Sequence, residues 1–549
     1  MQEEISEIID DVIKDQNPWH FNKDDWFYYD GALGDVIRAE NDGLYEPPKF
    51  YHYLKKILLN EFYNKGELRG IIVIRGPRRV GKTATLKYLI KDLIDIGINT
   101  RSLIYLSLDD ERLLFDFNRK KILRSVLSEI IYRFREYKPL LIILDEVTFY
   151  RGWARALKNL IDEGVISRGV AVIATGSYSL ELSSARSELS GRYGTFGEMV
   201  GGDVLFYPRR YVEIAESFLK QKGFNNFISI RLGSKAKRLG VLEYLAGYQT
   251  EANGRRYGYE NKINEIVSKF YDDLHALFKI YMFSGGYPKA FYESIIAQKT
   301  YNEPKVGDAR YRYDIYDLLV SDSRKFGLDP SIIEKILMNI IYPSFMISKN
   351  NNMLENSINI KNFYKYLTYL EASGLFMRLS SITSREDINS KSKIVNTSTK
   401  YQKFIVCDPA VFISSYCCSR EVTNIHNYMK KMFQKKPELK QLLFEAIVLS
   451  HLRYIPLRKP FRNISFISES GNEVTDGVLW YINYKDELIV IPIEVKTNAT
   501  SNIGKIISTA NEIEKQYGLR KLVVVSDSSD FINEENFVVI PIELFLLIF

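Results

Sequence analysis

The stretch Gly76-Pro77-Arg78-Arg79-Val80-Gly81-Lys82-Thr83 fits the pattern glycine, any four residues, then Gly-Lys-Ser/Thr. It follows Ile71-Ile72-Val73-Ile74, a short β-branched run that predicts a buried strand. It precedes Ala84–Ile94, in which apolar residues recur at helical spacing. The alternative is that so short a pattern matches by chance, and a strand before it and a helix after it make that alternative weaker. Strand, glycine loop and helix in this order therefore predict a phosphate-binding loop.

The chemistry of such a loop follows from its residue types. Glycines let the backbone wrap a phosphate and present N–H groups, and the start of the helix adds a partial positive charge. Lys82 is expected to reach the β and γ phosphates, and Thr83 to hold Mg²⁺. The residues expected around the nucleotide are Gly76, Pro77, Arg78, Arg79, Val80, Gly81, Lys82, Thr83 and Ala84. Asn22-Lys23-Asp24-Asp25 mimics a guanine-recognition motif but stands before the loop, so we expect ATP and not GTP.

Length and composition limit the class of protein. The chain has 549 residues, 46% hydrophobic and 26% charged, which predicts several soluble globular domains. A formal charge of +7 permits nucleic-acid binding without demanding it. Three cysteines form neither a disulfide framework nor a zinc site, which favours a reducing, cytoplasmic compartment. No stretch is long and apolar enough for a bilayer span, so no membrane partner is expected.

A second signature lies in Leu140–Glu146, where five apolar residues lead into two carboxylates. The apolar run predicts a buried parallel strand. Asp145 would emerge at its carboxyl end and help to hold Mg²⁺, and Glu146 would polarise the attacking water. Asp-Glu after a strand is also an ordinary way to begin a loop. Downstream of a phosphate-binding loop, the functional interpretation is favoured.

Three further motifs complete a resemblance. They are Leu189-Ser190-Gly191-Arg192, Phe206-Tyr207-Pro208 and Gly285-Gly286-Tyr287-Pro288. With the two signatures above, the chain resembles archaeal and bacterial AAA-type ATPases, which join a P-loop module to a winged helix and often to a nuclease-like domain. The resemblance implies that Arg192 approaches the γ-phosphate as an arginine finger or a sensor. The run after Pro208 departs from the family pattern, so no role is carried over to it.

The strand expected over residues 170–177 ends in polar residues. In P-loop ATPases that carry an additional strand, the end of that strand holds a polar sensor of the γ-phosphate. Thr175 and Ser177 are the candidates. The alternative, that they cap the next helix, stays open.

Residues 326–400 have the pattern of a winged helix. Helices are expected over 331–341 and 361–372, a strand over 375–379, and then a loop. The loop residues Arg385, Lys391, Lys393, Lys400 and Lys403 are basic, and Lys361 and Lys365 would face outward from the second helix. This clustering favours DNA contact. A winged helix used only for packing or dimerisation is the alternative.

The last 149 residues, 401–549, carry a different cluster. Two strand-like runs, 476–482 and 488–496, flank a polar turn, and pairing Ile482 with Leu488 would place Asp476 opposite Glu494. Glu494 and Lys496 share a face because side chains alternate along a strand. Asp…Glu-x-Lys is the arrangement of metal-dependent nucleases, with Asp476 and Glu494 as metal ligands. Glu445, on a preceding helix, would add a further carboxylate.

The sequence thus predicts an α/β multidomain protein with a parallel-sheet P-loop ATPase core of the AAA type. The expected parts are an N-terminal extension (1–65), an ATPase domain with a helical insertion and lid (66–325), a winged helix (326–400) and a restriction-endonuclease-like domain (401–549). The predicted function is Mg²⁺-dependent ATP hydrolysis coupled to a conformational change, acting on DNA. The alternative is a nucleotide-switched signalling or scaffold protein whose last domain only binds. The oligomeric state, including a homo-oligomer, is left open.

Overall fold

The chain divides into two compact units. Unit 1 comprises Met1–Pro208 with Ala372–Gly374, and unit 2 comprises Arg209–Glu371 with Leu375–Phe549. The computed structural model describes residues 2–22, 24–43, 45–113, 123–176, 187–221, 235–248, 256–301, 309–340, 346–347, 360–389, 391, 394–418, 420, 422, 424–454, 464–483 and 485–549.

Unit 1 is built on a parallel five-stranded sheet with the strand order β2-β3-β4-β1-β5. The strands are β1 (Arg69–Arg75), β2 (Leu103–Ser107), β3 (Leu140–Asp145), β4 (Val170–Gly176) and β5 (Asp203–Leu205). β1, β3 and β4 are the buried runs predicted from the sequence. Because β4 lies between β1 and β3, the sheet has the additional strand that we expected from the P-loop resemblance.

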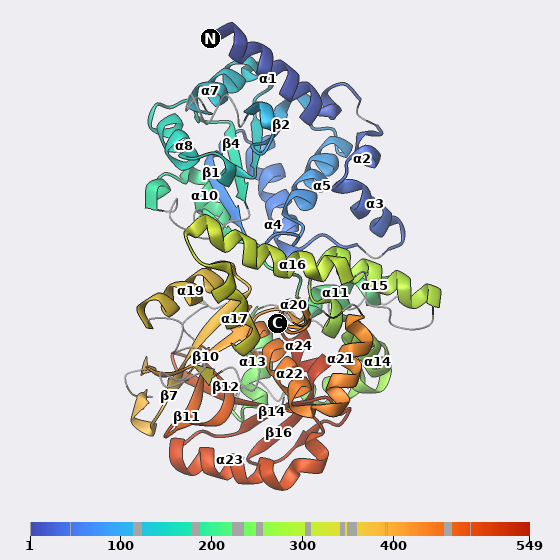
Figure 1. Cartoon of the computed structure of the whole chain (residues 1–549), viewed down its shortest axis with the longest axis vertical. Helices are drawn as coiled ribbons and strands as arrows, with labels where there is room; N and C mark the ends of the chain where they lie inside the picture. The colour runs from blue at the N-terminus through green and yellow to red at the C-terminus, as the bar shows by residue number, and fades with distance from the viewer. Residues whose placement is uncertain are drawn as a thin grey trace. The chain divides into compact units, whose positions relative to one another are not determined.

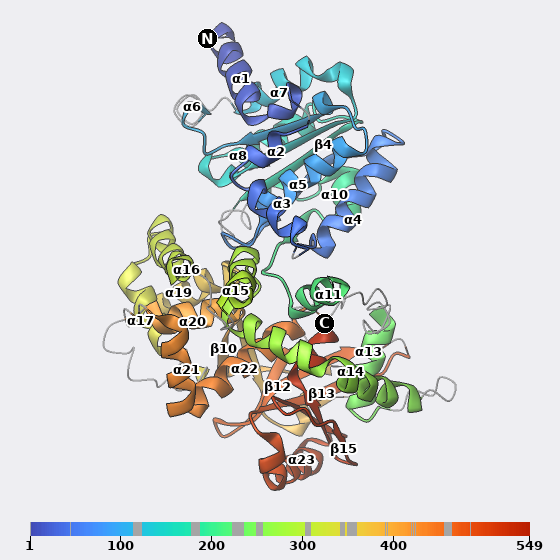
Figure 2. The same cartoon turned by 90° about the vertical axis from the view of Figure 1, so that its right-hand side faces the viewer.

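Helices cover both faces of this sheet (Figure 2). Buried side chains of α1 (Gln2–Gln16), α7 (Leu123–Arg133) and α8 (Trp153–Asp162) share one core with the strands. On the other face, Ile74 of β1 lines a small pocket together with Leu86 and Leu89 of α5 (Lys82–Asp95) and with residues of α4 (Lys49–Ile57), which packs against α5. The shorter described helical segments are η1 (Pro18–His20), α2 (Trp26–Tyr29), α3 (Leu33–Asn41), η2 (Leu58–Tyr63), η3 (Thr100–Ser102), α6 (Glu111–Leu113), η5 (Arg135–Tyr137), η6 (Val147–Phe149) and α10 (Gly194–Val200).

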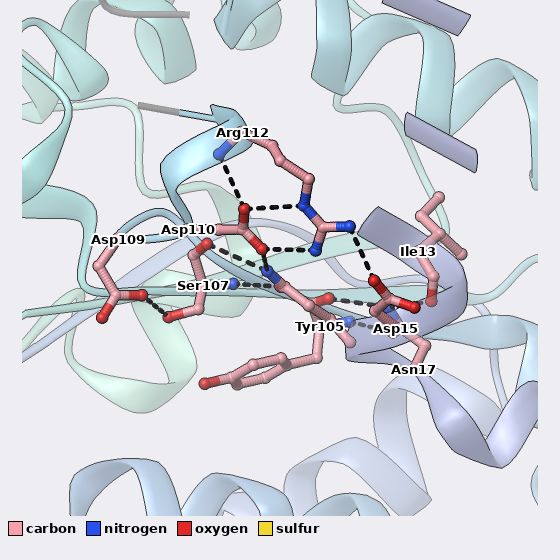
Figure 3. A network of polar contacts seen from close by, with 9 residues as sticks. Ile13, Asp15, Asn17, Tyr105, Ser107, Asp109, Asp110 and Arg112 are labelled. Carbon is pink, nitrogen blue, oxygen red and sulfur yellow. Dashed lines mark hydrogen bonds and ion pairs between the residues drawn. The ribbon is translucent and has the colours of Figure 1, made fainter. Parts of the chain in front are cut away.

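The predicted N-terminal extension is an integral part of unit 1, because it closes the edge strand β2 (Figure 3). Asn17 accepts a hydrogen bond from Tyr105 N at 2.7 Å and donates one to Tyr105 O at 2.9 Å. Gln16 makes the same pair of bonds to Ser107, at 2.7 and 3.4 Å. Trp19 Nε1 donates to Leu103 O at 3.0 Å. Side chains thus take the place of a neighbouring strand, and the edge is not open to pairing with another chain.

Unit 2 contains a nine-stranded mixed sheet with the order β15-β16-β14-β13-β12-β11-β7-β10-β6. The strands are β6 (Met346–Ile347), β7 (Phe376–Ile382), β10 (Ser398–Val406), β11 (Ile464–Glu469), β12 (Asn472–Ile482), β13 (Leu488–Lys496), β14 (Leu522–Ser526), β15 (Ile532–Asn533) and β16 (Phe537–Pro541). A separate pair, β8 (Ile388–Asn389) and β9 (Ile394–Val395), lies between β7 and β10 in the chain.

Helices α22 (Pro437–Leu452) and α23 (Ile503–Tyr517) pack against this sheet, and α23 shares a core with β12, β13, β14 and β16 (Figure 1). The other described helices of unit 2 are α11 (Tyr211–Gln221), α13 (Lys235–Leu245), α14 (Arg256–Ser284), α15 (Pro288–Tyr301), α16 (Ala309–Asp322), η7 (Ser323–Phe326), α17 (Pro330–Ile340), α19 (Ile360–Ala372), η8 (Arg385–Asp387), α20 (Pro409–Cys418), α21 (Ile425–Lys435), η10 (Ala499–Asn502) and α24 (Ile542–Leu547).

The elements expected of a winged helix form where the pattern placed them, as α17, α19, β7 and β10. Their strands, however, belong to the large sheet, because β7 pairs with β10 on one side and with β11 on the other. The expected boundary at residue 400 falls inside β10. A separate winged-helix module therefore stays a prediction.

The expected lid also lies in a different unit from the one predicted. Residues 209–325 belong to unit 2 and not to the ATPase unit. One contact that ties this segment to the rest of unit 2 is the turn at Gly285-Gly286, where Gly286 N donates to the buried carboxylate of Asp408 at 2.9 Å. A Cβ on Gly285 would stand 2.0 Å from Asp408 Oδ1, so only glycine fits this contact.

Candidate functional site

Three strand ends meet at the carboxyl edge of the unit 1 sheet. β4 pairs with β1 through Ile74↔Thr175 and with β3 through Leu144↔Ala174. Because the strands are parallel, the loops that follow β1, β3 and β4 leave the sheet at the same edge. This is where open α/β sheets bind their ligands.

The glycine loop follows β1 and ends at α5, as the sequence predicted. Gly76 faces the backbone of Phe206, and a Cβ there would come within 2.0 Å of Phe206 O. Gly81 has a φ of 94°, a conformation that side chains with a Cβ disfavour. These two positions explain why the pattern needs glycine. Val80 is buried beneath the loop, whereas Arg79 is exposed.

Lys82, the first residue of α5, is buried at the base of this loop. Its amine donates to Gly76 O at 2.9 Å and to Pro77 O at 2.7 Å. Burial lowers the pKa of Lys82 to about 8, against the raising effect of Glu146 and Asp145. The amine therefore carries its proton at neutral pH and is in place for an anionic partner.

Asp145 ends β3 with 1% of its surface exposed, and both of its carboxylate oxygens accept hydrogen bonds. Oδ2 accepts from Thr83 Oγ1 at 2.6 Å and from Tyr105 OH at 2.8 Å, and Oδ1 accepts from Glu146 N at 2.9 Å. A hydroxyl and a carboxylate in contact are oxygen ligands of the kind that Mg²⁺ takes beside a nucleotide. The predicted magnesium pair, Thr83 and Asp145, fits this donor set.

Glu146 follows Asp145 in a left-handed backbone conformation, with φ 51° and ψ 39°. Residues other than glycine adopt this conformation rarely and at a cost, and such residues concentrate at functional sites. Glu146 is close enough to Lys82 to raise the pKa of its amine. The geometry is compatible with the water-orienting role predicted for Glu146.

Thr175 lies on β4, beside the last residues of β1 and β3. Its side chain is fully buried, and its hydroxyl finds no hydrogen-bond partner among the described residues. A buried hydroxyl without a partner costs free energy, so its presence calls for a reason. A γ-phosphate oxygen would supply the partner. Ser177, the other sensor candidate, lies outside the described residues.

Arg192 is not where a sensor within the same chain would stand. The neighbouring Tyr193 O accepts from Ile71 N, and Gly194 lies against Arg69, both at the amino end of β1. β1 has 7 residues, which at about 3.3 Å per residue puts roughly 20 Å between that end and the glycine loop. Arg192 instead pairs with Asp162 at 2.8 Å. Its role as a sensor in cis is therefore wrong, and a finger offered to a second copy stays a prediction.

Tyr105 is the residue of this site that the sequence analysis missed. It sits in the middle of β2, and no motif marks it. The contact between its phenol and the end of β3 depends on β2 and β3 becoming neighbours in the sheet, which no local pattern of the sequence gives.

In unit 2 the four residues of the predicted nuclease-like cluster come together. β12 and β13 pair with Ile482 opposite Leu488, which is the predicted register. Asp476 N donates to Glu494 Oε2 at 3.3 Å, and Val495 N donates to Asp476 Oδ2 at 2.6 Å. Lys496 Nζ lies 2.5 Å from Glu494 Oε1. Glu445 reaches the same place from α22, with an oxygen within 4.8 Å of one on Asp476.

Two further residues enter this cluster that the sequence analysis did not place there. Lys403, expected on an exposed basic loop, is 1% exposed on β10. Its amine donates to Glu445 Oε1 at 2.7 Å, to Asp476 O at 2.9 Å and to the carboxylate of Glu473. The reason for the error is that β10 continues past residue 400 into the sheet. Arg385, Lys391 and Lys400 are exposed as expected, while Lys393 lies outside the described residues.

Burial also changes the proton affinity of the cluster. It raises the pKa of Glu445 to about 7, although the positive charge of Lys403 acts in the opposite direction. It raises the pKa of Glu494 to about 8, and the nearby Asp476 carboxylate adds to the effect. The lysines therefore face carboxyl groups that hold protons more firmly than usual.

These residues do not fit a nuclease metal site in the arrangement observed. Glu445, Glu473 and Asp476 have oxygens close enough to share an ion. The Lys403 ammonium, however, already bonds two of these carboxylates and is enclosed by the core. A divalent ion at the same oxygens would take the carboxylate partners of the Lys403 ammonium and leave this buried charge without its counter-charges, which is costly.

Replacing Thr175 by valine should change stability and activity in opposite directions. Thr175→Val keeps the shape but removes the unsatisfied hydroxyl, so the free energy of unfolding without nucleotide should rise by about 1 kcal/mol. ATP turnover should fall at least tenfold if the hydroxyl meets the γ-phosphate. Urea unfolding and a phosphate-release assay measure the two effects. A fall in stability with unchanged turnover would remove Thr175 from the site.

Replacing Lys403 by methionine should expose its role as the cation of the cluster. Lys403→Met should cost about 3–5 kcal/mol, because it leaves buried carboxylates without a counter-charge. Adding Glu445→Gln should recover at least about 1 kcal/mol of this loss. Lys400→Met, on the exposed part of the same strand, is the control and should have little effect. Additive losses in the double variant would show that the two side chains are not coupled.

Comparison with known proteins agrees with the site in unit 1. Residues 68–201 match the sequence family described as an AAA domain. An uncharacterized protein of Methanocaldococcus jannaschii is 31% identical over 120 residues, which is 22% of this chain. That match spans 24% of the relative's own length. The family match supports an AAA-type P-loop ATPase domain, with ATP binding, in this part of the chain.

Solved structures give weaker likenesses. The Walker-type ATPase of Pyrococcus abyssi is 13% identical, with a TM-score of 0.39 over 67% of this chain and 95% of its own. Cdc6p of Pyrobaculum aerophilum is 12% identical, with a TM-score of 0.26 over 77% of this chain and 99% of its own. Scores this low do not establish a common fold.

Among the described residues, no helix has the length and apolar character needed to cross a membrane.

Proposed function

We propose that this chain binds ATP together with Mg²⁺ at the carboxyl edge of the unit 1 sheet, hydrolyses it, and acts on DNA. The observation that carries the proposal is the meeting of Lys82, the Thr83–Asp145 pair and Thr175 at that edge. Lys82 and Thr83 follow the loop after β1, Asp145 ends β3, and Thr175 lies near the end of β4. Their chemistry is what a nucleoside triphosphate needs: one cation, a metal-binding oxygen pair and a buried hydroxyl.

The roles follow from the contacts. The loop backbone and the start of α5 favour the phosphates through N–H groups and the helix dipole. Lys82 exchanges its bonds to the carbonyls of Gly76 and Pro77 for bonds to phosphate oxygens. Thr83 and Asp145 would hold Mg²⁺, which neutralises phosphate charge when bound. Glu146 orients the attacking water, and the Thr175 hydroxyl contacts the terminal phosphate.

Support for DNA as the partner is electrostatic. Arg385, Lys391 and Lys400 are exposed on and around the β8–β9 pair of unit 2. Lys391 lies between the two strands of this hairpin, Arg385 before it and Lys400 after it. Exposed basic residues suit contact with phosphates, which fixes position without reading sequence. Under the competing proposal, a nucleotide-switched scaffold, this surface would bind protein and DNA would leave turnover unchanged.

For the carboxylate cluster of unit 2 we favour a binding module over a nuclease. Asp476, Glu494 and Lys496 have the arrangement of a nuclease motif, but Lys403 already neutralises its neighbours. A cluster closed in this way holds β10, β12 and α22 together without a metal ion.

The hydrolysis proposal predicts two different losses. Lys82→Ala should weaken ATP binding at least tenfold, because the other buried groups that we assign to the phosphates carry no positive charge. Glu146→Gln should keep ATP affinity within about threefold and lose turnover, because a neutral amide cannot accept a proton from the attacking water. Equilibrium binding of ATP and steady-state phosphate release measure both. Normal turnover by Glu146→Gln would mean that another group orients the water.

The DNA proposal predicts a salt-dependent interface. Reversing Lys391 and Lys400 to glutamate should weaken binding to all duplex sequences and flatten the dependence of affinity on salt. Reversing Lys505 and Lys515 to glutamate, two exposed lysines on α23 of the same unit, is the control matched for net charge. Intact protein should raise its ATP turnover with DNA present and leave that DNA uncut in Mg²⁺ or Mn²⁺.

Equal losses in the α23 control, with Lys505 and Lys515 reversed, and in the Lys391 and Lys400 double variant would move the DNA surface elsewhere. Turnover that is indifferent to DNA would favour the scaffold. Cleavage that disappears in Asp476→Ala and in Lys496→Ala, with ATP hydrolysis preserved, would restore the nuclease.

A further inference from the structure

Tyr105 links the edge strand of the unit 1 sheet to the magnesium pair. Its ring is 4% exposed, and its hydroxyl donates to Asp145 Oδ2 at 2.8 Å. A phenol O–H can donate and a carboxylate oxygen can only accept, so Tyr105 is the donor in this contact.

This bond completes the set of donors that fixes the Asp145 side chain. The Glu146 amide holds Oδ1 from the following residue, and Thr83 bonds Oδ2 from α5. Thr83 is also the hydroxyl that the magnesium site needs. Of the two donors to Oδ2, Thr83 is thus assigned to the metal, and Tyr105 is assigned no contact with nucleotide or metal.

Tyr105 is itself held from several directions. Its backbone pairs with the Asn17 side chain on the outer side of β2 (Figure 3). On the inner side it pairs with β3, where Tyr105 lies opposite Ile143. The Lys87 ammonium lies 4.9 Å from the centre of its ring, and Asp30 pairs with that ammonium at 2.5 Å. Backbone and ring are therefore fixed independently of each other.

Asn17 has no freedom of its own. It is fully buried, and besides its two bonds to Tyr105 it donates to Ile13 O at 3.1 Å. Asn17 therefore joins the end of α1 to the residue of β2 whose hydroxyl bonds the Asp145 carboxylate. The N-terminal helix and the metal-binding carboxylate are two bonded contacts apart.

We propose that Tyr105 is a positioning residue for Asp145, and that Asn17 holds Tyr105 in register, so that the N-terminal segment sets the metal affinity of the nucleotide site. The inference rests on the proposed Mg²⁺-ATP function. It assigns Tyr105 no contact with nucleotide or metal. Losing its hydroxyl frees the carboxylate to turn, which weakens metal binding while the loop, Lys82 and Glu146 remain.

The test is a Mg²⁺ titration at constant ATP in the full chain, with equilibrium ATP binding and ATP turnover both followed. In Tyr105→Phe, the Mg²⁺ concentration for the half-maximal effect on binding and on turnover should rise about three- to tenfold, an effect of the size expected for part of one hydrogen bond to a charged group. Turnover at saturating Mg²⁺ should recover to at least about half of the intact value, and the unfolding temperature should stay close to it. A merely structural role would move the last quantity and leave the first.

Tyr88→Phe is the matched control. Tyr88, on α5 of the same unit, also donates its hydroxyl to a carboxylate, that of Glu40, away from Asp145. It should leave the Mg²⁺ requirement unchanged. Asn17→Ala should shift the requirement in the same direction as Tyr105→Phe, and combining the two should give less than the sum of the separate effects.

The outcomes separate the inference from the function on which it rests. Intact protein that hydrolyses ATP without needing Mg²⁺, or not at all, would overturn the proposed function. Mg²⁺-dependent turnover in the intact chain with the same requirement in Tyr105→Phe and Tyr88→Phe would overturn the inference alone. If Asn17→Ala does not fold, the comparison of the two phenylalanine variants still decides the role of Tyr105.

Discussion

The parallel pairing of β1, β4 and β3 is the constraint on which the nucleotide site depends. Parallel strands bring the carboxyl ends of segments far apart in sequence to one edge, and here those ends carry the glycine loop, Thr175 and Asp145. No single element contains the site. A shift of one residue in the β1–β4 register would turn Thr175 to the opposite face of the sheet and bury a different side chain at the edge.

Charge is handled differently in the two units. In unit 1, the Lys82 amine bonds to main-chain carbonyls, and burial lowers its pKa to about 8. An anion can therefore replace the carbonyls as the partner of this amine without breaking an ion pair. In unit 2, Lys403 bonds carboxylates directly and is enclosed by the core. The first arrangement suits a site that exchanges ligands. The second suits a structural role, and we therefore interpret the nuclease-like motif of unit 2 as a stable hydrogen-bonded network.

The sequence predicted what short-range patterns control. The glycine loop, the strands at 140–145 and 170–176, and the pairing of Ile482 with Leu488 follow from local composition and spacing, and the structure has them. It could not predict contacts that depend on which strands become neighbours. Lys403 was predicted on a basic loop, but it is buried because β10 pairs within the large sheet. Arg192 was predicted near the γ-phosphate, but the residues that follow it lie at the amino end of β1.

The central claim is that Thr83, Asp145 and Lys82 together hold ATP with Mg²⁺, and equilibrium binding of ATP to the intact chain tests it most directly. The account predicts binding that weakens at least tenfold when Mg²⁺ is removed with a chelator, and that also weakens at least tenfold in Lys82→Ala. ATP binding of equal strength in the presence and absence of Mg²⁺, or an affinity for ATP that Lys82→Ala leaves unchanged, would contradict it.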